Sequence, residues 1–545
     1  MILSQKRRIG YNQIMQNNLH YILCGMILIW AGITPRSASA ASTAGSNDLW
    51  NLASKQAKVH RFATLFTAQD MRDSLSSDAG VEKAMDWCHA TGVTHVYLET
   101  FRDGYQAPRE TMIAARDRFK AKGFLVSGCV TTTKVGRPSS ASKDTISCYT
   151  DSATQNRLKS IFEYTAGLFD EIMIDDFWFT DCKCPECNAE RMAKTVKIGS
   201  ASFAVSGGTW EDYRCELMVQ LSRLNVLAAS KAVNPKCKVI IKYPQWYDQF
   251  QDRGYEVVRE TADFDRIWVG TETRDYSNKN WGGTVQYEAF FIMRWLGGIG
   301  GSKCGGGWFD WLGTTERTYV EQARQTVLGG ARESFLFCYG GLQSQTGPKD
   351  VQAFRANVPE LIAVAREVGR RKLTGIAAYK PANSHPEKEA RVFDFVGMLG
   401  LPLNPCHEFP FKAPAAFFSL HALKDPDFVN HLKTYVASKK PVLLTDGLAK
   451  RIEAQIALDA SNIHILKVSG DPKSLLTLSA DDLATLRKPF LKPFKTAFKA
   501  PNGVSLYLFT DHSWVIENFN NSSASVEING QTIDIEPRGW KYLWK

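Results

Sequence analysis

The chain of 545 residues lacks the features that would point to a membrane, a nucleic acid or a nucleotide. After residue 40, no apolar run approaches the roughly 18 residues of a membrane-spanning helix. The formal net charge of +10 falls to about +6 without the basic residues of the first 40, and what remains is spread out, so a polyanion-binding surface is not expected. Neither a phosphate-binding loop nor a dinucleotide glycine fingerprint is present, so a nucleotide role has no support.

The first 40 residues are composed like a secretory signal peptide. A basic stretch, "QKRR", precedes the apolar "YILCGMILIWAGI", and Ala38-Ser39-Ala40 resembles a small-residue cleavage site. We expect a secreted or periplasmic protein that is cleaved after Ala40 and keeps no stable membrane span. An uncleaved anchor is the alternative.

Residues 61–341 alternate between short apolar runs and helical patterns. Eight runs end in polar residues: "RFATLF" (61–66), "THVYLET" (94–100), "FLVSGCV" (124–130), "EIMIDDF" (171–177), "KVIIKYP" (238–244), "RIWVGTET" (266–273), "GGIGGSKCGGGWFDW" (297–311) and "SFLFCYGG" (334–341). Helical patterns between them predict a (β/α)8 TIM barrel over residues 41–372. In such barrels the chemistry lies at the C-terminal ends of the strands. We expect the glycines of the seventh run to form a flexible active-site loop.

The pattern of predicted strands and helices changes after the barrel. Residues 373–475 again suggest strands and helices, in a smaller α/β domain. Residues 476–545 end in a stretch that alternates like β-strands, with Asn, Gly and Pro at the turns, and predict a C-terminal β domain.

Eleven cysteines remain after the expected cleavage, and an odd number cannot all pair within one chain. Cys182, Cys184 and Cys187 lie within six residues, just after the fourth predicted strand. Closely spaced cysteines suit a tetrahedral zinc site, and a local disulfide with spare thiols is the alternative.

Residues 171–190, "EIMIDDFWFTDCKCPECNAE", resemble the fourth-strand region of the glycoside hydrolase family 42 β-galactosidases. In that family an Asn-Glu pair ends the strand and a cysteine zinc cluster follows. The resemblance implies that Cys148 is the fourth ligand and that the zinc is structural, with the other cysteines as buried thiols or a stray disulfide. It also implies a flavodoxin- or amidotransferase-like middle domain and a homotrimer. Amidotransferase chemistry is not expected, because "VLLTDGLAK" carries no cysteine nucleophile.

Two carboxyl groups are what a glycosidase needs, and their separation differs between retaining and inverting enzymes. Asp175 and Asp176 alternate along a strand, so only one is expected to face the barrel mouth. The resemblance implies that Asp176 matches the family's acid/base glutamate and that Asp175 matches its sugar-binding asparagine. Both positions depart from the family pattern, so β-galactosidase activity is not expected.

The second carboxylate has two candidates. The resemblance points to the end of the seventh strand, which offers Asp310. Glu272, at the end of the sixth, is the rival, and a pair from strands four and six resembles the arrangement of α-galactosidase-like barrels. We favour Glu272, because "TETRD" gathers acidic and basic residues at one strand end.

Other residues at the predicted strand ends suit a sugar pocket. Aromatic faces pack on the C–H surfaces of sugars, and charged groups bond their hydroxyls. Besides Asp175, the expected substrate-binding residues are Glu99, Trp178, Lys242, Tyr243, Trp246, Arg274 and Trp308.

Taken together, these features predict an exported glycoside hydrolase that acts on oligo- or polysaccharides. Asp176 is expected to be the general acid/base, and Glu272 or Asp310 the second carboxylate. The alternative is a carbohydrate-binding barrel that has lost its chemistry. A separation between the carboxyl groups well beyond roughly 10 Å would favour the binding protein. A catalytic metal is disfavoured, since four cysteine ligands leave no open position.

Overall fold

The computed structural model describes residues 46–274 and 285–545. The predicted signal peptide lies outside these ranges. Within them, no helix combines the length and the apolar character that crossing a membrane requires.

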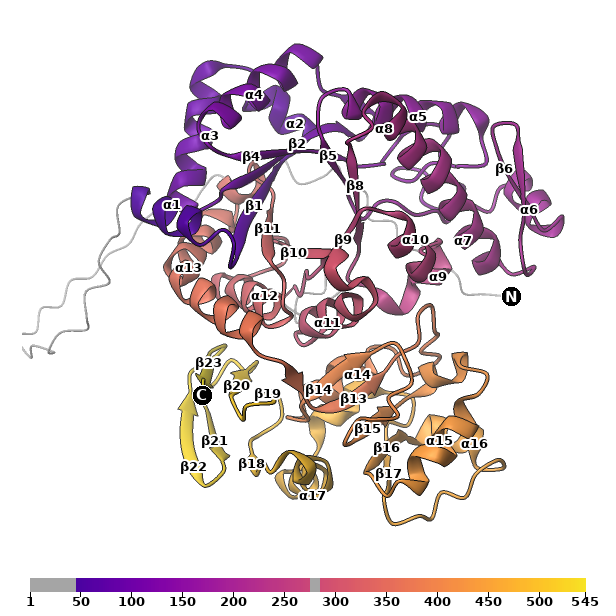
Figure 1. The fold of residues 1–545 in the computed structure, drawn as a ribbon, viewed down its shortest axis with the longest axis vertical. Helices are drawn as coiled ribbons and strands as arrows, with labels where there is room; N and C mark the ends of the chain where they lie inside the picture. Colours follow the sequence, from indigo (N-terminus) through magenta and orange to yellow (C-terminus); the bar gives the residue numbers. More distant parts are fainter. Residues whose placement is uncertain (1–45, 275–284) are drawn as a thin grey trace, which may run out of the picture. The chain divides into compact units, whose positions relative to one another are not determined.

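Eight parallel strands close into a barrel, which confirms the predicted fold class (Figure 1). Each is a run of buried, mostly apolar residues, as expected for strands covered on both faces. Closure is complete because the first strand pairs with both the second and the last. The strands are β1 (Arg61–Phe66), β2 (His95–Arg102), β4 (Leu125–Val130), β5 (Glu171–Ile174), β8 (Lys238–Tyr243), β9 (Arg266–Gly270), β10 (Cys304–Asp310) and β11 (Glu333–Phe337).

A helix follows each strand and packs on the outside of the barrel. The helices are α3 (Asp78–Thr91), α4 (Arg109–Ala121), α5 (Ser152–Ala166), α7 (Trp210–Leu221), α10 (Val257–Asp263), α11 (Glu288–Gly300), α12 (Glu316–Leu328) and α13 (Gly347–Arg370). Local sequence defines their ends. The Ser77 side chain caps the first turn of α3, and Gly92 ends that helix with a φ of 70°, which glycine adopts without strain.

The glycine-rich run does not form the predicted active-site loop. Gly297–Gly300 completes α11, and β10 begins at Cys304, so these glycines precede their strand and lie away from its catalytic end. Within β10, a Cβ on Gly306 would lie 2.7 Å from the Trp268 ring and 2.4 Å from the Glu333 carbonyl oxygen. The glycine therefore lets a large indole and a neighbouring strand pack tightly inside the barrel.

The next part of the chain is a five-stranded parallel sheet with the order β14-β13-β15-β16-β17. This 2-1-3-4-5 order is that of flavodoxin-like folds, as the sequence predicted. Its strands are β13 (Ile376–Tyr379), β14 (Leu403–Cys406), β15 (Ala416–Phe418), β16 (Val442–Thr445) and β17 (Ile463–Leu466). Helices α14 (Val392–Gly397), α15 (Phe428–Ala437) and α16 (Asp446–Ile452) connect them.

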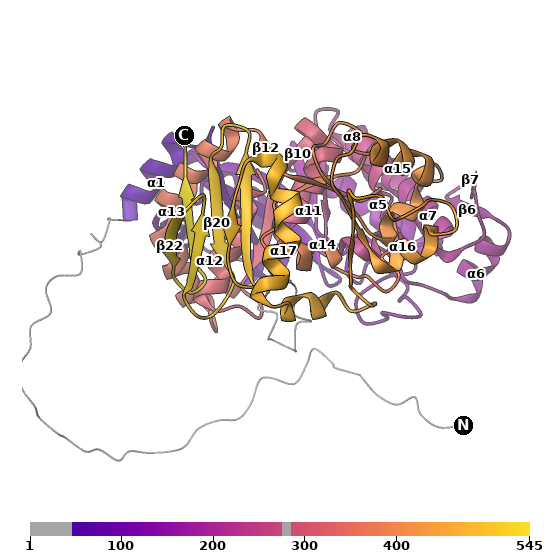
Figure 2. The ribbon, with the colours of Figure 1, turned by 90° about the horizontal axis from the view of Figure 1, so that it is seen from below.

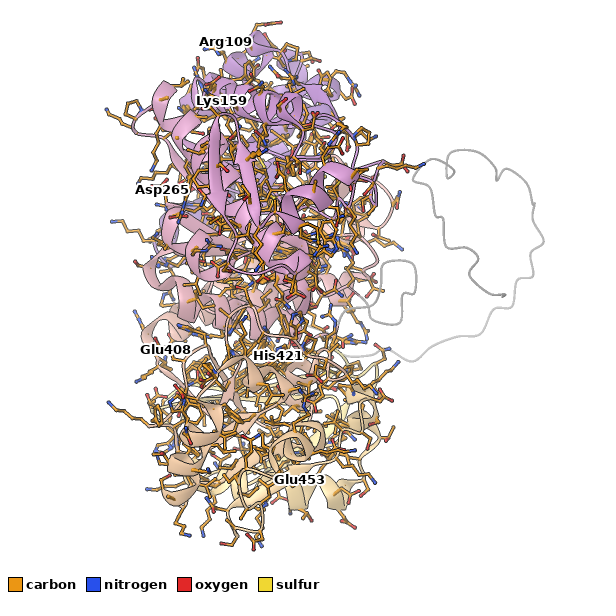
Figure 3. The ribbon with its side chains drawn as sticks, turned by 90° about the vertical axis from the view of Figure 1, so that its right-hand side faces the viewer. Arg109, Lys159, Asp265, Glu408, His421 and Glu453 are labelled. Atoms are coloured by element: carbon orange, nitrogen blue, oxygen red, sulfur yellow. The ribbon has the colours of Figure 1, made fainter. Side chains whose placement is uncertain are left out.

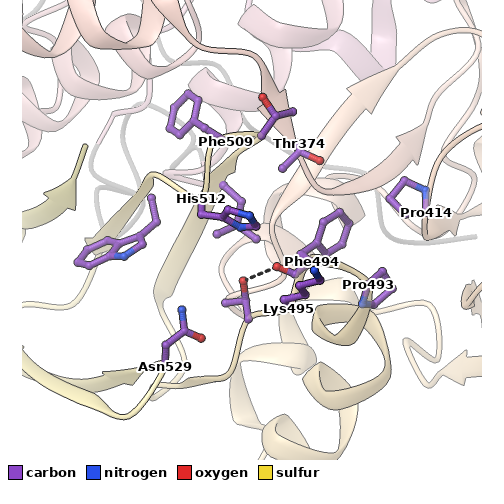
Figure 4. Close-up of a pocket in the computed structure, with 12 residues that line it drawn as sticks. Thr374, Pro414, Pro493, Phe494, Lys495, Phe509, His512 and Asn529 are labelled. Atoms are coloured by element: carbon purple, nitrogen blue, oxygen red, sulfur yellow. Dashed lines mark hydrogen bonds between the residues drawn. The ribbon is translucent and has the colours of Figure 1, made fainter. Parts of the chain in front are cut away.

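The last part is antiparallel β-structure preceded by helix α17 (Ala480–Leu491) (Figure 2). One sheet has the order β12-β19-β20-β23 and the other β18-β21-β22. Their strands are β12 (Leu373–Thr374), β18 (Phe498–Lys499), β19 (Val504–Phe509), β20 (Trp514–Asn518), β21 (Ala524–Ile528), β22 (Gln531–Ile535) and β23 (Trp540–Leu543). A hollow of about 250 Å³ beside them is lined by Phe494, Lys495 and His512, and no acidic side chain from the described part of the chain lines it (Figure 4).

Buried ion pairs join the barrel to both later parts of the chain. Arg391 pairs with Glu288 of α11. His421, labelled in Figure 3, lies 3.0 Å from Asp248, but this contact is not an ion pair at neutral pH, because burial lowers the pKa of His421 to about 4. From the C-terminal sheets, Arg538 approaches Glu321 of α12 to 3.3 Å. The described residues form one compact unit, and the domain boundaries at 372 and 475 stay predictions.

Candidate active site

A cluster of charged side chains lies at the C-terminal ends of the barrel strands. Its members come from strands far apart in sequence, as expected when parallel strands end at one rim. They are Glu99 and Arg102 of β2, Asp175 and Asp176 after β5, Lys242 of β8, Glu272 and Arg274 after β9, and Asp310 of β10. The structure therefore brings together all three predicted catalytic acids.

Lys242 is the centre of this cluster. Its Nζ lies 2.7 Å from Asp176 Oδ2 and 2.6 Å from Glu272 Oε1, and Asp175 Oδ1 is at 3.7 Å. The ammonium also sits 4.3 Å from the centroid of the Trp308 ring. Burial alone lowers the pKa of Lys242, but the surrounding carboxylates outweigh it and hold the pKa above its ordinary value, so the lysine stays charged.

The two carboxyl groups that Lys242 bridges are close enough to act on one bond. Asp176 Oδ2 and Glu272 Oε1, which both accept from Lys242 Nζ, lie no more than about 5.3 Å apart, because that is the sum of their distances to Nζ. Retaining glycosidases separate their carboxyl groups by about 5–5.5 Å. The upper bound excludes the separation of well over roughly 10 Å that would favour a carbohydrate-binding protein.

Burial also raises the pKa values of Asp176 and Glu272, and by different amounts. It raises the pKa of Asp176 to about 6, with the Asp175 carboxylate adding to the shift and Lys242 opposing it. It raises the pKa of Glu272 to about 8, and Asp176 and Asp310 add to that shift. The Glu272 side chain is 3% exposed and that of Asp176 18%, which agrees with the larger shift at Glu272. Both shifts are upward and the larger one is at Glu272, so of the two groups Glu272 holds its proton to the higher pH.

Asp175 does not alternate with Asp176 as the strand pattern predicted. Strand β5 ends at Ile174, so both aspartates lie in the following turn and both reach the cluster. Arg102 donates to Asp175 Oδ2 at 2.7 Å and to Glu99 Oε2 at 2.8 Å. Burial opposes ionisation of Asp175, but Lys242 and Arg102 lower its pKa, so it is an ionised carboxylate fixed by cations.

Asp310 is held in a similar way. The Arg274 guanidinium donates to both of its oxygens, at 3.3 and 2.5 Å, and the backbone N–H of Leu312 donates to Oδ1. A bidentate pair of this kind fixes the orientation of the carboxylate and occupies both of its oxygens. Glu272 is therefore the better candidate for the second catalytic carboxyl group.

The aromatic residues that were predicted to bind substrate fall into two groups in the structure. Trp308 fills the barrel interior beside Lys242, and Trp246 is half-buried against Tyr255, whose hydroxyl donates to the Asp176 carbonyl oxygen at 2.8 Å. Trp178 and Tyr243, by contrast, are fully buried outside the barrel. Trp178 donates to Ser222, and the Tyr243 hydroxyl lies 3.1 Å from that of Thr261. The prediction that these two bind substrate is wrong, because both point into the helix layer.

Sequence reasoning did not identify Gln245 or Tyr255. With its amide oriented to suit both neighbours, Gln245 donates to Glu272 Oε2 at 2.9 Å and accepts from Arg274 at 3.3 Å. Gln245 lies two residues after β8, and this place at a strand end could have identified it from the sequence. Tyr255 follows no strand, and nothing in the local sequence points to it.

Four cysteines form a second centre beside this cluster. Cys148 precedes α5, Cys182 and Cys184 lie in the turn after the two aspartates, and Cys187 is in α6 (Pro185–Met192). Their sulfur atoms all lie within 4.8 Å of one another. Three of the separations are 3.4, 3.6 and 3.7 Å. These exceed the roughly 2.05 Å of a disulfide and match the edges of about 3.8 Å in a tetrahedron with zinc–sulfur bonds of about 2.3 Å.

Hydrogen-bond donors surround these sulfur atoms. Arg137 lies 3.1 Å from Cys148 Sγ, the backbone N–H of Ser140 3.4 Å from Cys182 Sγ, and the Thr150 hydroxyl 2.9 Å from Cys187 Sγ. Such donors stabilise thiolates, the form that binds a metal. The cluster can hold a structural metal such as zinc, which would fix the turn that carries Asp175 and Asp176.

Comparisons with known proteins identify the family of the barrel. Residues 46–360 match the family described as "Probable glycosyl hydrolase, catalytic domain". An uncharacterized protein of Saccharolobus solfataricus is 26% identical over 373 residues, which cover 64% of this chain and 60% of that protein. The match therefore spans about three fifths of the length of that relative.

Two solved structures share the fold. An α-L-fucosidase isoenzyme of Paenibacillus thiaminolyticus superposes with a TM-score of 0.61 and 8% identity, over 86% of this chain and 92% of the other. A family 42 exo-carrageenase of Bacteroides ovatus gives a TM-score of 0.52 and 10% identity, over 84% and 80%. At these identities the likeness concerns the fold alone.

Proposed function

This chain belongs to the family of probable glycosyl hydrolase catalytic domains, and from that premise we propose that it hydrolyses O-glycosidic bonds in oligo- or polysaccharides with Asp176 and Glu272. The observation that carries the proposal is the bridging of these two carboxyl groups by buried Lys242, which holds one oxygen of each within about 5.3 Å of the other, inside the reach of one glycosidic bond.

The acidities favour roles opposite to those that the resemblance implied. Protonated Glu272 gives its proton to the leaving oxygen while ionised Asp176 attacks the anomeric carbon, so the glycosidic bond breaks and a glycosyl ester forms. The Glu272 carboxylate then takes a proton from water, which attacks the same carbon and releases Asp176. Lys242 positions both groups and keeps Asp176 ionised.

The proposal also covers the metal site, export and assembly. We propose that zinc occupies the four-cysteine cluster and braces the Asp175–Asp176 turn, in a site closed to substrate. Export through residues 1–40 and assembly as a homotrimer remain parts of the proposal that rest on the sequence.

The dependence of activity on pH follows from the two carboxyl groups. Asp176 must lose its proton to attack, so kcat/KM should rise as the pH passes about 6. Glu272 must keep its proton, so kcat/KM should fall as the pH passes about 8. We expect a bell-shaped profile with a maximum near neutrality, in which the two apparent values belong to the coupled pair. A profile that stays flat between pH 5 and 9 would contradict these roles.

Sugar release from a panel of substrates tests the function directly. The panel should hold α- and β-linked aryl glycosides, including α-L-fucosides, and polysaccharides, including carrageenans. Turnover with retention of the anomeric configuration, followed by NMR, supports the proposal. Binding to a polysaccharide without turnover would instead identify a carbohydrate-binding barrel.

A further inference from the structure

A groove on the C-terminal β-structure shares no residue with the catalytic cluster. It consists of two hollows of about 250 and 360 Å³, and Figure 4 shows the first of them. Both are lined by Lys495, His512, Trp514 and Asn529, so the two hollows adjoin. Sites for small molecules usually have volumes of about 300–1,000 Å³, and the groove is large enough to be one of them.

Trp514 gives the groove a largely buried hydrogen-bond donor. It belongs to β20 and lines both hollows, although it is only 7% exposed. Its indole N–H has no acceptor among the residues that the structure describes. A buried tryptophan usually finds a partner for this group, so a free donor beside a hollow suits an oxygen atom of a ligand.

The groove is also basic. Lys495 lines both hollows, and within residues 46–274 and 285–545 no acidic group lies within ion-pair distance of its ammonium. No acidic side chain from these ranges lines either hollow. The acid next to His512 in the chain is Asp511, whose carboxylate accepts from Arg371 at 2.8 Å. A negatively charged ligand would therefore meet a cation that has no partner of its own.

Three turns bring the polar residues of the groove together. Lys495 follows a short 3-10 turn, His512 lies between β19 and β20, and Asn529 lies between β21 and β22. Their φ angles are 53°, 66° and 50°, in the left-handed region that costs energy for residues other than glycine and recurs at ligand sites. The Oδ1 of Asn529 accepts from the N–H of Ala497 at 2.8 Å, which leaves its amide nitrogen to donate to a ligand.

We propose that this groove is a second saccharide site, which binds a sugar that carries a sulfate or a carboxylate. Phe494 and two prolines form an apolar wall that suits the C–H face of a sugar ring, and the donors suit its hydroxyl groups. Lys495 would pair with the anionic group. The choice of a sugar as ligand rests on the proposed function, since an enzyme that holds its polysaccharide at a second point raises the local concentration of the substrate.

Calorimetry with short oligosaccharides and the full chain tests the groove. The probes are a sulfated galactan oligosaccharide, an oligogalacturonate and a neutral galacto-oligosaccharide. The wild type should bind one or both charged probes at least about tenfold more tightly than the neutral one, and the tighter of the two tells sulfate from carboxylate. Lys495→Gln should remove this preference, because the charge-assisted bond is lost. His512→Asn should weaken binding severalfold, and asparagine tolerates the positive φ of this position.

Lys499→Gln is the matched control. It removes the same charge from the same region, but Lys499 pairs with Glu527 at 2.8 Å and lines neither hollow, so binding should be unchanged. Calorimetry needs no turnover, so a failure of the roles of Asp176 and Glu272 would leave these results as they are. Equal affinity for charged and neutral probes, no binding of either charged probe, or a loss that Lys499→Gln shares would overturn the proposal.

Discussion

Glu272→Gln is expected to lower kcat/KM by about 10²- to 10⁴-fold on substrates with poor leaving groups, because the leaving oxygen then receives no proton. On dinitrophenyl glycosides the loss should be small, since dinitrophenolate departs without protonation. The alkaline limb of the pH profile should disappear in the same variant, because its group is Glu272. Initial rates on the two substrate types, compared across pH 5–9, measure both effects.

Asp176→Asn should lose at least as much activity, and on both substrate types, because a good leaving group replaces a missing acid but does not replace a missing nucleophile. The control is Glu163→Gln, which also replaces a carboxylate by an amide. Glu163 pairs with Lys159 on the outside of α5, so this variant should keep the activity of the wild type. If instead Asp176→Asn spared dinitrophenyl glycosides and Glu272→Gln did not, the two roles would have to be exchanged.

Cys187→Ser is expected to lower the free energy of unfolding by about 4 kcal/mol or more, the range that loss of a structural metal can reach. The reason is that three thiolates hold zinc far less tightly than four, and the loop between β5 and α6 loses its anchor. The variant should contain less than one tightly bound zinc per chain and unfold at a lower temperature. Metal analysis and a thermal melt on the same sample measure both.

The matched control for this prediction is Cys406→Ser. Cys406 is a half-buried thiol of β14 outside the cluster, so its replacement should leave the zinc content unchanged. A Cys187→Ser variant with full zinc content and an unaltered melt would show that the cluster holds no metal of structural importance.

The barrel could be predicted because its signal is local. Each buried parallel strand is a short apolar run, and each ends in polar residues that the fold collects at one rim. The glycine-rich run at residues 297–311, which ends in β10, was misjudged because glycine can provide either flexibility or close packing. Flexibility was expected, whereas Gly306 serves close packing against Trp268, a residue 38 positions away that no local pattern indicates.

The members of the active-site cluster were foreseen better than their roles. Asp176, Glu272 and Lys242 could be proposed from their places at strand ends. Which acid keeps its proton depends on burial and on neighbours from other strands, and these exist only in the folded chain. Trp178 was misassigned for a similar reason. A residue that follows a strand end can turn into the helix layer, and sequence alone does not give that direction.

The buried ion pairs between Glu288 and Arg391 and between Glu321 and Arg538 bear on how this protein could be divided. A shortened chain that stopped after α13 would retain two buried acids, Glu288 and Glu321, whose arginine partners Arg391 and Arg538 had been cut away. Removing one partner of a buried pair costs about 3–5 kcal/mol. The catalytic barrel is therefore not an interchangeable cassette: a gene fusion that supplied it with a different tail would have to replace these cations as well.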